Sequence, residues 1–390
     1  MAAGIDDAAL LDFTRRLLRA RSVYEPDSGA TEQSAAEVVA EQMRAFGWDP
    51  LIEEAAPGRP NVIATLEGDR PGPALLFEGH TDVVTEGDPR AWSHDPYGAE
   101  VVDGRLYARG AADMKGGVAA MLFAADRLAR EGFAGRLVIG ALVDEEGMML
   151  GVKDFCRRGH ATGLDAALIC EPEGSEVCIA QKGALRLRVE VPGRMAHGAM
   201  PQEGSDPIPP LARFLDFVAR TQEELQRERG RHRYLGWDYL TPTWVAAGSE
   251  VQFNVIPGSA AAGIDVRTTA GTDHAALVAR LRAALPAGAR LEVIDDRPAT
   301  DTPEGHPLVR AALGAHETVL GGPPALGGVP GATDGTILVR DAGVPIVTCG
   351  PGGKWIAHKV DEYVEVSELL AYARIFAETA RRYFSEAGGG

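Results

Sequence analysis

Apolar residues in the first half of the chain follow two patterns. Leu10, Phe13 and Leu17 recur at helical spacing, which predicts an amphipathic helix over Ala8–Arg21. Short uninterrupted apolar runs predict buried strands instead, because both faces of such a strand meet the core. The strands expected on this basis are Asn61–Leu66, Ala74–Phe77, Leu137–Val143 and Ala166–Cys170, and further helices are expected at Thr31–Phe46, Val118–Arg130 and Val152–Arg158. This alternation favours an α/β fold with a mostly parallel sheet.

The pattern changes after Lys182–Gly183, where alternating polar and apolar residues indicate half-exposed strands. The elements then follow the order βαββαβ, which is typical of a ferredoxin-like unit. They are expected at Ala184–Val191, Asp206–Gln226, Thr243–Gly248, Ala260–Arg267, Asp273–Leu285 and Arg290–Ile294. A strand at Val344–Gly350 and a helix at Ser367–Tyr383 then resume the first pattern. We therefore expect a discontinuous larger domain, 1–183 and 298–390, interrupted by a smaller domain, 184–297.

Composition narrows the class of protein. A chain of 390 residues, 45% hydrophobic and 24% charged, is typical of a globular protein with two domains. No apolar run approaches the ~20 residues of a membrane span, and the first residues lack the basic start of a secretory signal. The net charge of −17 argues against nucleic acid or an anionic membrane as a partner. The four cysteines lack CxxC spacing, which fits a reduced, cytoplasmic setting.

Side chains of the kind that bind metals follow directly after the predicted strands. They are His80 after the strand at 74–77, Glu145 and Glu146 after 137–143, Glu171 after 166–170, and His358 after 344–350. In open α/β sheets, sites form outside the carboxyl ends of the strands. Asp113 adds a carboxylate just before a Lys115–Gly117 turn and a helix. We expect these side chains to meet in one crevice.

The residue types suit a centre of two divalent ions. Nitrogen and oxygen ligands without thiolate favour zinc, with cobalt or manganese as substitutes. A shared carboxylate, here Asp113, holds two ions about 3.5–4 Å apart around an acidified bridging water. Asp82 lies two residues from His80 in extended backbone, so its carboxylate can stand behind the imidazole and fix the tautomer.

The adjacent acids Glu145 and Glu146 suit two different tasks. Successive side chains diverge, so one can bind a metal while the other carries a proton from the water to the leaving amine. We assign the proton transfer to Glu145 and the metal to Glu146. Spacing alone leaves the reverse assignment open.

Together these motifs resemble the M20 metallopeptidase family, the group of acetylornithine deacetylase, succinyl-diaminopimelate desuccinylase and glutamate carboxypeptidase. The resemblance covers nearly the whole chain. It is carried by RPNV, HTDVV, GRLYARGAADMKGG, DEEG, EPEG and GPGGKWIAHKVDEYV. A single HxD or EE is a weak signal, whereas the joint order and spacing of these motifs is specific.

The resemblance implies a phosphorylase/hydrolase-like zinc-peptidase catalytic domain with the ferredoxin-like domain inserted as a lid and dimerisation domain. It implies that two zinc ions are bound, with Asp113 bridging them, by His80, Asp113, Glu146, Glu171 and His358. It also implies that Asp82 orients His80 and that Glu145 acts as acid and base.

The resemblance also implies functional residues outside the ligand set. His197 is similar to a family histidine that stabilises the oxyanion, often across a dimer interface, which implies a homodimer. Asn254 and Arg267 match family positions associated with substrate binding, and a guanidinium suits a substrate carboxylate. Asp334 resembles part of a family loop near the substrate.

The chain departs from the family pattern in its methionines. Met148 and Met149 follow the DEEG motif, and Met195 and Met200 flank His197, where smaller or polar residues are typical. Flexible, polarizable methionines can line an apolar acyl pocket, and the alternative is that they fill the core. The pocket interpretation favours a bulky or apolar acyl group over the acyl groups of acetylornithine or succinyl-diaminopimelate.

The function expected from the sequence is a metal-dependent amidohydrolase. It would cleave the amide bond of an N-acyl amino acid, a small-molecule substrate, through attack by a metal-bridging hydroxide. One alternative is a dipeptidase or carboxypeptidase of the same family, and a requirement for a free α-amine would mark the dipeptidase. The other is a catalytically silent binding or regulatory member, against which the intact ligand set and Glu145 argue.

Overall fold

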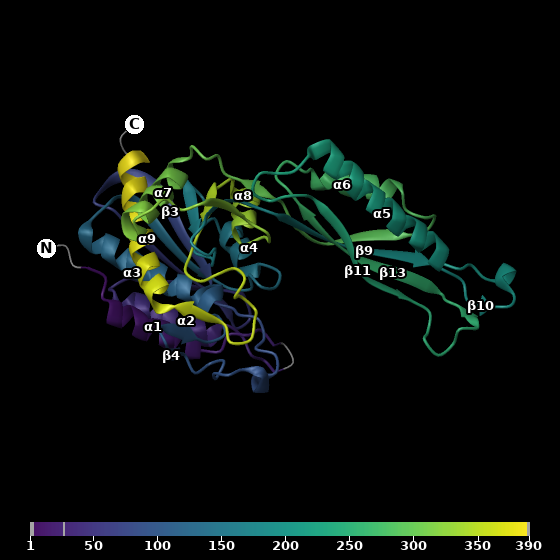
Figure 1. The fold of residues 1–390 in the computed structure, drawn as a ribbon, viewed down its shortest axis with the longest axis horizontal. Coiled ribbons are helices and arrows are strands. Elements are labelled where there is room, and N and C mark those ends of the chain that lie inside the picture. The colour runs from purple at the N-terminus through teal and green to yellow at the C-terminus, as the bar shows by residue number, and fades with distance from the viewer. Residues whose placement is uncertain (1–3, 26–27, 388–390) are drawn as a thin grey trace. The chain divides into compact units, whose positions relative to one another are not determined.

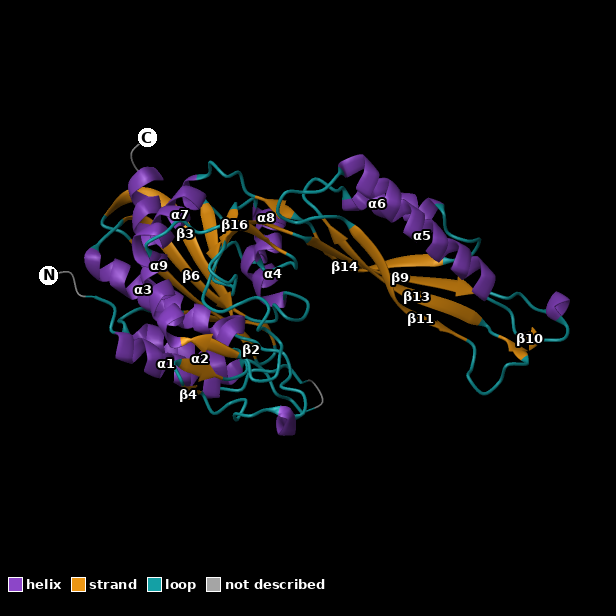
Figure 2. Cartoon of the chain, viewed as in Figure 1, coloured by secondary structure: helices purple, strands orange, loops and turns teal. Residues whose placement is uncertain are grey.

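The structure, a computed structural model, describes residues 4–25 and 28–387 (Figures 1 and 2). The chain folds into two compact units. Unit 1 consists of Met1–Ile179, Thr302–Gly327 and Thr333–Gly390, and unit 2 of Ala180–Asp301 and Gly328–Ala332. The smaller domain predicted at 184–297 lies inside the bounds of unit 2, and the short return at 328–332 was not predicted. The outermost residues of the predicted larger domain, 1–3 and 388–390, lie outside the described residues.

Unit 1 contains an α/β sheet with its covering helices. Its helices are α1 (Asp7–Arg19), α2 (Gln33–Ala45), α3 (Gly116–Glu131), α4 (Leu150–Arg157), α7 (Pro307–Leu320), α8 (Gly335–Ala342) and α9 (Val366–Ala387). Its strands are β1 (Leu51–Ala56), β2 (Arg59–Glu67), β3 (Arg70–His80), β4 (Glu100–Val102), β5 (Arg105–Tyr107), β6 (Ala134–Leu142), β7 (Ala166–Ile169), β17 (Ile346–Thr348) and β18 (Tyr363–Glu365). The strands β8 (Val177–Gln181), β15 (Thr300–Asp301) and β16 (Leu326–Val329) lie where the chain passes between the units. Among the described helices, none is long and apolar enough to cross a membrane.

The large sheet has a parallel centre and antiparallel edges. Its strands follow the order β1-β2-β6-β3-β7-β17-β8-β15, with β16 also paired to β8. β3 runs parallel to β6 and β7, and β17 runs parallel to β7. The pairs β1/β2, β2/β6 and β17/β8 are antiparallel. The four central strands therefore end at the same edge of the sheet, as the predicted fold class requires.

Helices pack on both faces of this sheet because successive strand residues point to opposite sides. Leu76 joins one buried cluster with Phe155 of α4 and Ile337 of α8. Its neighbour Phe77 faces the other way, and its ring lies 6.0 Å from that of Phe376 in α9. All five side chains are fully buried. The apolar run predicted as a strand buried on both faces is thus confirmed.

Unit 2 has the predicted ferredoxin-like order of elements. They are β9 (Gly183–Pro192), α5 (Ile208–Arg229), β11 (Tyr239–Ala247), β13 (Ser259–Thr268), α6 (His274–Ala283) and β14 (Arg290–Arg297). The four strands form an antiparallel sheet in the order β11-β13-β9-β14. Alternate residues Leu185, Leu187 and Val189 of β9 pack with α5 and α6 in one apolar cluster. A short ribbon pairs β10 (Ala196–His197) with β12 (Val255–Ile256).

Candidate metal centre

The parallel strands of unit 1 bring the predicted ligands to one edge of the sheet. His80 is the last residue of β3 and lies opposite Leu142, the last residue of β6. Glu145 and Glu146 follow β6 within four residues of Leu142. Glu171 follows β7, which lies on the other side of β3. Three acids and an imidazole therefore gather here because their strands are parallel neighbours.

The two remaining ligands come from loops rather than from strand ends. Asp113 lies in the short turn η2 (Ala111–Lys115), directly before α3, and its peptide bond to Met114 is cis. His358 lies in the loop between β17 and β18, with a left-handed φ of 65°. A left-handed φ is uncommon for a residue other than glycine.

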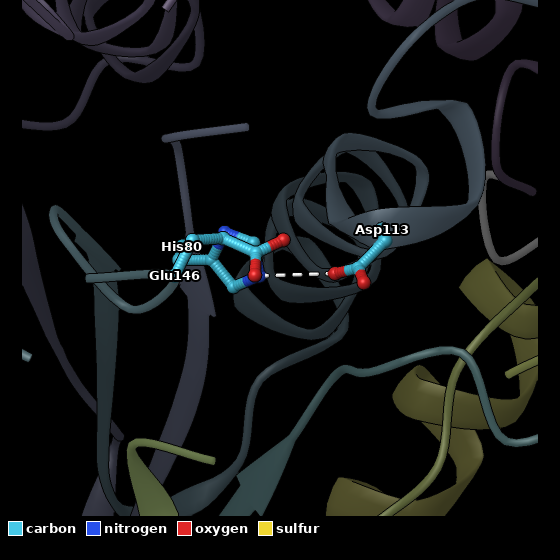
Figure 3. Close-up of side chains that lie close together, drawn as sticks. All are labelled: His80, Asp113 and Glu146. Atoms are coloured by element: carbon cyan, nitrogen blue, oxygen red, sulfur yellow. Dashed lines mark hydrogen bonds and ion pairs between the residues drawn. The ribbon is translucent and has the colours of Figure 1, made fainter. Parts of the chain in front are cut away.

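Asp113 lies between the two histidines. Its Oδ1 lies 3.1 Å from His80 Nε2 (Figure 3), and its Oδ2 lies 3.3 Å from His358 Nε2. Glu171 Oε1 lies 3.5 Å from His80 Nε2, while Glu146 Oε1 lies 2.7 Å from His358 Nε2. The five side chains thus form two half-sites that share Asp113, one with His80 and Glu171 and the other with His358 and Glu146.

The donor atoms are close enough to surround cations. One atom each from His80, Asp113 and Glu146 lie within 4.8 Å of one another, and the same holds for His80, Glu145 and Glu171. All of these donors are imidazole nitrogen or carboxylate oxygen, a set that suits zinc and related divalent ions. The arrangement fits a metal centre in its donor types as well as in its spacing.

Burial raises the pKa values of acids in the cluster, and neighbouring carboxylates raise those of the two histidines. Burial, followed by the charge of Asp113, raises the pKa of Glu171 to about 8, and burial also raises that of Glu145 well above its ordinary value. Burial lowers the pKa of His80, but Glu171 and Asp113 outweigh it and leave this pKa well above its ordinary value. Hydrogen bonds to Asp113 and Glu146 raise the pKa of His358 to about 10. The raised pKa values of the acids reflect burial and mutual repulsion of several carboxylates, which bound cations would relieve.

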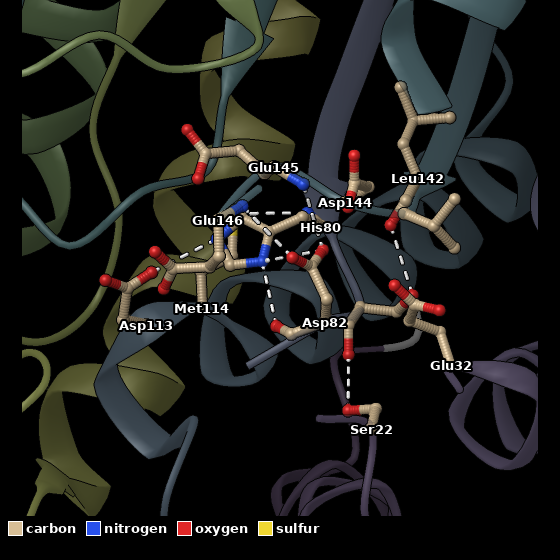
Figure 4. A network of polar contacts seen from close by, with 12 residues as sticks. Ser22, Glu32, His80, Asp82, Asp113, Met114, Leu142, Asp144, Glu145 and Glu146 are labelled. Atoms are coloured by element: carbon tan, nitrogen blue, oxygen red, sulfur yellow. Dashed lines mark hydrogen bonds and ion pairs between the residues drawn. The ribbon is translucent and has the colours of Figure 1, made fainter. Parts of the chain in front are cut away.

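Asp82 contacts more than the imidazole (Figure 4). Its backbone carbonyl lies 3.0 Å from His80 Nδ1, whereas its carboxylate Oδ1 lies 3.5 Å from the same atom. The carboxylate accepts the backbone N–H groups of Glu145 at 3.2 Å and Glu146 at 3.0 Å. Asp82 therefore contacts both the ring predicted as a ligand and the turn that carries the two acids.

A second carboxylate holds the turn after β6 from the other side. Asp144 Oδ2 accepts the N–H groups of Met148 at 3.0 Å and Leu150 at 3.2 Å. The guanidinium of Arg59 lies 2.6 Å from Asp144 Oδ1 and also pairs with the buried carboxylate of Glu32. These bonds fix the backbone on which Glu145 and Glu146 stand.

Asp334, predicted to lie near the substrate, is at the start of α8 and is fully buried. The pKa of Glu78, two residues before His80, is raised well above its ordinary value by burial and next by the charge of Asp334. Asp334 thus lies close to a buried acid of β3, and its predicted place near the substrate remains a prediction.

Three further predicted residues belong to unit 2. His197 lies in β10, is exposed, and accepts the N–H of Ala199 at 3.0 Å through Nδ1. Asn254 is exposed in the loop before β12. Arg267 lies in β13, where its Nε donates to Asp265 at 2.9 Å. Their predicted contacts with substrate remain predictions.

Three charged residues that support the ligands lie within the family motifs, and the sequence predicts no role for them. Glu362 accepts two backbone N–H groups of the η2 turn and pairs with Arg109. Lys115 is fully buried and donates to the carbonyls of Leu17 at 3.2 Å and Ala20 at 2.6 Å. One sequence feature could have revealed them. A charged residue inside an otherwise apolar or glycine-rich motif indicates a buried charge with polar partners.

Comparison with known proteins identifies the family. The model of peptidase family M20/M25/M40 matches residues 76–382. The chain belongs to this family. It is 33% identical over 398 residues to the succinyl-diaminopimelate desuccinylase of Rhodospirillum centenum, covering 96% of this chain and 97% of the relative. It is also 33% identical, over 401 residues and with the same coverage, to the enzyme of that name from Methylobacterium radiotolerans.

Solved structures of M20 proteins share the fold. An M20 metallo-carboxypeptidase, Sso-CP2 from Sulfolobus solfataricus, superposes with a TM-score of 0.78 at 17% identity, over 96% of this chain and 99% of that one. YXEP of Bacillus subtilis, described as a dinuclear metal-binding M20 peptidase, gives 0.71 at 17% identity, over 97% and 98%. This M20 protein is therefore a hydrolase of amide or peptide bonds, and its α/β fold is the one expected.

Proposed function

We propose that this M20 protein is a di-metal amidohydrolase that removes the acyl group from an N-acyl amino acid. The observation that carries the proposal is the meeting of His80, Asp113, Glu146, Glu171 and His358 in two half-sites around Asp113. The similarity to enzymes named for removal of a succinyl group supports deacylation over peptide cleavage.

In the proposed centre, the five side chains would hold two zinc ions, with Asp113 shared between them and with cobalt or manganese as functional substitutes. When bound, the ions acidify a water molecule and polarise the amide carbonyl. Glu146 is assigned to the metal because its carboxylate contacts His358 directly at 2.7 Å. Its neighbour Glu145 has no such contact with His358 among the described interactions, which leaves it for proton transfer.

Glu145 is proposed to take a proton from the attacking water and to deliver it to the leaving amine. Its buried side chain lies beside His80 and Glu171. Burial raises its pKa well above the ordinary value, which suits a group that must both accept and release a proton. Asp82 is proposed to keep Glu145 in place through its backbone N–H and to fix the tautomer of His80.

Residues of unit 2 are proposed to complete the substrate site. His197 would stabilise the oxyanion, and Asn254 and Arg267 would bind the substrate, Arg267 through a carboxylate. Substrate must then replace the present bond between Arg267 and Asp265. Replacing His197 with alanine should lower kcat while the metal content stays at the wild-type value.

An apolar or bulky acyl group is the proposed preference. Met148, directly after the DEEG motif, is 39% exposed, and Met195 and Met200 are also exposed. Met149 is different, because it is fully buried in the cluster beneath α4 and therefore fills the core. The proposal accordingly rests on Met148, Met195 and Met200.

The test is hydrolysis of a panel of N-acetyl, N-succinyl, N-benzoyl and N-octanoyl amino acids together with dipeptides, with added Zn²⁺, Co²⁺ or Mn²⁺. We expect metal-dependent release of the free amino acid, fastest with the benzoyl or octanoyl group. Fastest turnover of N-succinyl-diaminopimelate would overturn the acyl preference alone. Cleavage restricted to peptides with a free α-amine would replace deacylase by dipeptidase, and no hydrolysis with metals bound would favour a silent member.

A homodimer formed through unit 2 is also proposed. β11 is an edge strand, and its residues Trp244 and Val245 are about half exposed. In the loop that follows, Val251 is 86% and Phe253 93% exposed. Exposed apolar side chains beside an unpaired strand edge are typical of association surfaces. Sedimentation equilibrium should give twice the chain mass, and Val251→Asp with Phe253→Asp should shift it towards the monomer.

A further inference from the structure

Lys354 joins two segments of unit 1 through one buried acid, Glu173, and one partly exposed acid, Glu176. Its Nζ lies 2.9 Å from Glu173 Oε2 and 2.8 Å from Glu176 Oε2. The Glu173 side chain is 3% exposed and that of Lys354 17% exposed, so solvent screens this ion pair only weakly. Neither Lys354 nor the two acids belongs to the proposed ligand set.

The ion pair connects the two segments that carry proposed ligands. Glu173 lies two residues after Glu171, and Lys354 lies four residues before His358. A backbone bond reinforces the connection, because the N–H of Gly174 donates to the carbonyl of Gly352 at 3.0 Å. The loop with His358 is therefore tied to the segment with Glu171 by one backbone bond and one ion-pair cluster.

Little of the loop with His358 is buried. No residue from 353 to 361 is buried, and Trp355, next to Lys354, is 70% exposed. The side chain of His358 is 51% exposed, whereas that of Glu171 is 9% exposed. Because apolar burial contributes little here, the position of His358 depends on polar contacts. Besides the contacts of the His358 ring itself, these include the bond from Arg109 to the carbonyl of Lys359 at 3.1 Å, the bond from the N–H of Ser93 to Asp361 Oδ1 at 2.7 Å, and the Lys354 cluster.

We propose that Lys354 is a positioning residue that holds His358 in the metal centre through its ion pair with Glu173. Without the ammonium group, Glu173 keeps a buried carboxylate with no cation beside it, and the loop loses the anchor that lies on the side of Glu171. The half-site of His358 and Glu146 should then weaken, while that of His80 and Glu171, fixed at strand ends, should not. This role rests on the proposed function, because it presupposes that the cluster binds two ions.

The experiment is a titration of Co²⁺ into the metal-free full chain, followed by equilibrium dialysis and by the visible absorption of the bound cobalt. The variants are Lys354→Met, Lys354→Arg and, as a matched control from the same loop, Lys359→Met, whose side chain is exposed. His358→Ala identifies which of the two binding steps belongs to the His358 half-site.

We expect Lys354→Met to weaken one of the two cobalt-binding steps and to leave the other nearly unchanged. In Lys354→Met, the step assigned to His358 should weaken by about 10- to 100-fold, the range for residues that orient metal ligands, while the other step changes less than about twofold. Lys354→Arg should restore most of the affinity, since it keeps the charge, and Lys359→Met should match the wild type. Thermal unfolding of the metal-free variants shows whether stability changes as well.

Two outcomes overturn the role of Lys354. One is unchanged affinity at both steps in Lys354→Met. The other is equal weakening of both steps together with a lower unfolding temperature, which would mean that the ion pair only stabilises the fold. Failure of the wild type to bind cobalt would instead overturn the metal centre, and the role of Lys354 with it.

Discussion

The carboxylate of Glu362 accepts the backbone N–H of Asp113 at 3.0 Å. The same oxygen accepts the N–H of Ala112 at 3.0 Å, and the other oxygen pairs with Arg109. Glu362 is fully buried, and burial raises its pKa to about 7. One acid thus fixes the backbone of the residue that lies between the two histidines.

Replacing Glu362 with glutamine should impair the centre without touching a proposed ligand. The amide offers one acceptor oxygen and leaves Arg109 buried without a counter-charge, which costs about 3–5 kcal/mol. We expect a lower free energy of unfolding in urea and a lower content of bound metal after dialysis. Glu365→Gln, on the more exposed surface of β18 with Arg105 as its partner, is the control and should change neither quantity. Wild-type metal content in Glu362→Gln would contradict this role.

Asp82→Asn should distinguish the role of the Asp82 carboxylate from that of its backbone carbonyl. Asparagine keeps one acceptor oxygen but loses the charge, so the turn with Glu145 and Glu146 loosens and the tautomer of His80 is less firmly held. We expect kcat to fall by about 10- to 100-fold, as for other residues that orient metal ligands. Steady-state kinetics and metal analysis measure the effect, with the exposed cap Asp88→Asn as the control. An unchanged kcat would show that the backbone carbonyl of Asp82 suffices.

Gly350→Ala should disturb the position of Glu171. A β-carbon on Gly350 would clash with the carbonyl of Cys170 and come within 2.7 Å of the carbonyl oxygen of Glu171, and backbone atoms cannot turn aside. Strand ends β7 and β17 must then separate, and overpacking of this kind costs about 1–3 kcal/mol. Gly353→Ala meets only the flexible Ile356 side chain at 3.4 Å and should be tolerated. Equal unfolding free energies for the two variants would refute the argument.

Removing metal should abolish hydrolysis and lower stability together. Ions that bind only the folded chain stabilise it by about 2.7 kcal/mol at a hundredfold excess over Kd. Dialysis against dipicolinate should therefore lower Tm, and Zn²⁺ should restore both Tm and activity. The variant Glu146→Gln should show a smaller recovery of Tm, because one half-site is incomplete. A Tm that does not respond to Zn²⁺ would argue against the proposed centre.

Strands with a clear apolar run or a clear alternation of polar and apolar residues were predictable, because these patterns lie within a short stretch of sequence. The buried strand around Phe77 and the alternating strand around Leu187 both lie where expected. Strand β1 was not predicted, since Leu51 and Ile52 at this sheet edge are each 45% exposed and form no distinct apolar pattern. The parallel centre was expected, whereas the antiparallel pairs β2/β6 and β17/β8 depend on pairings between distant segments.

The sequence by itself determined which side chains follow the central strands, because each apolar run and the polar residues after it are adjacent in the chain. Parallel strands then bring the residues after each strand to one edge of the sheet. Only the tertiary structure decided what holds those side chains in place. The Asp82 carboxylate reaches the turn of Glu145, and Glu362 reaches Asp113 across 249 positions of the chain. Such contacts join segments that fold together only through packing, so no local pattern records them.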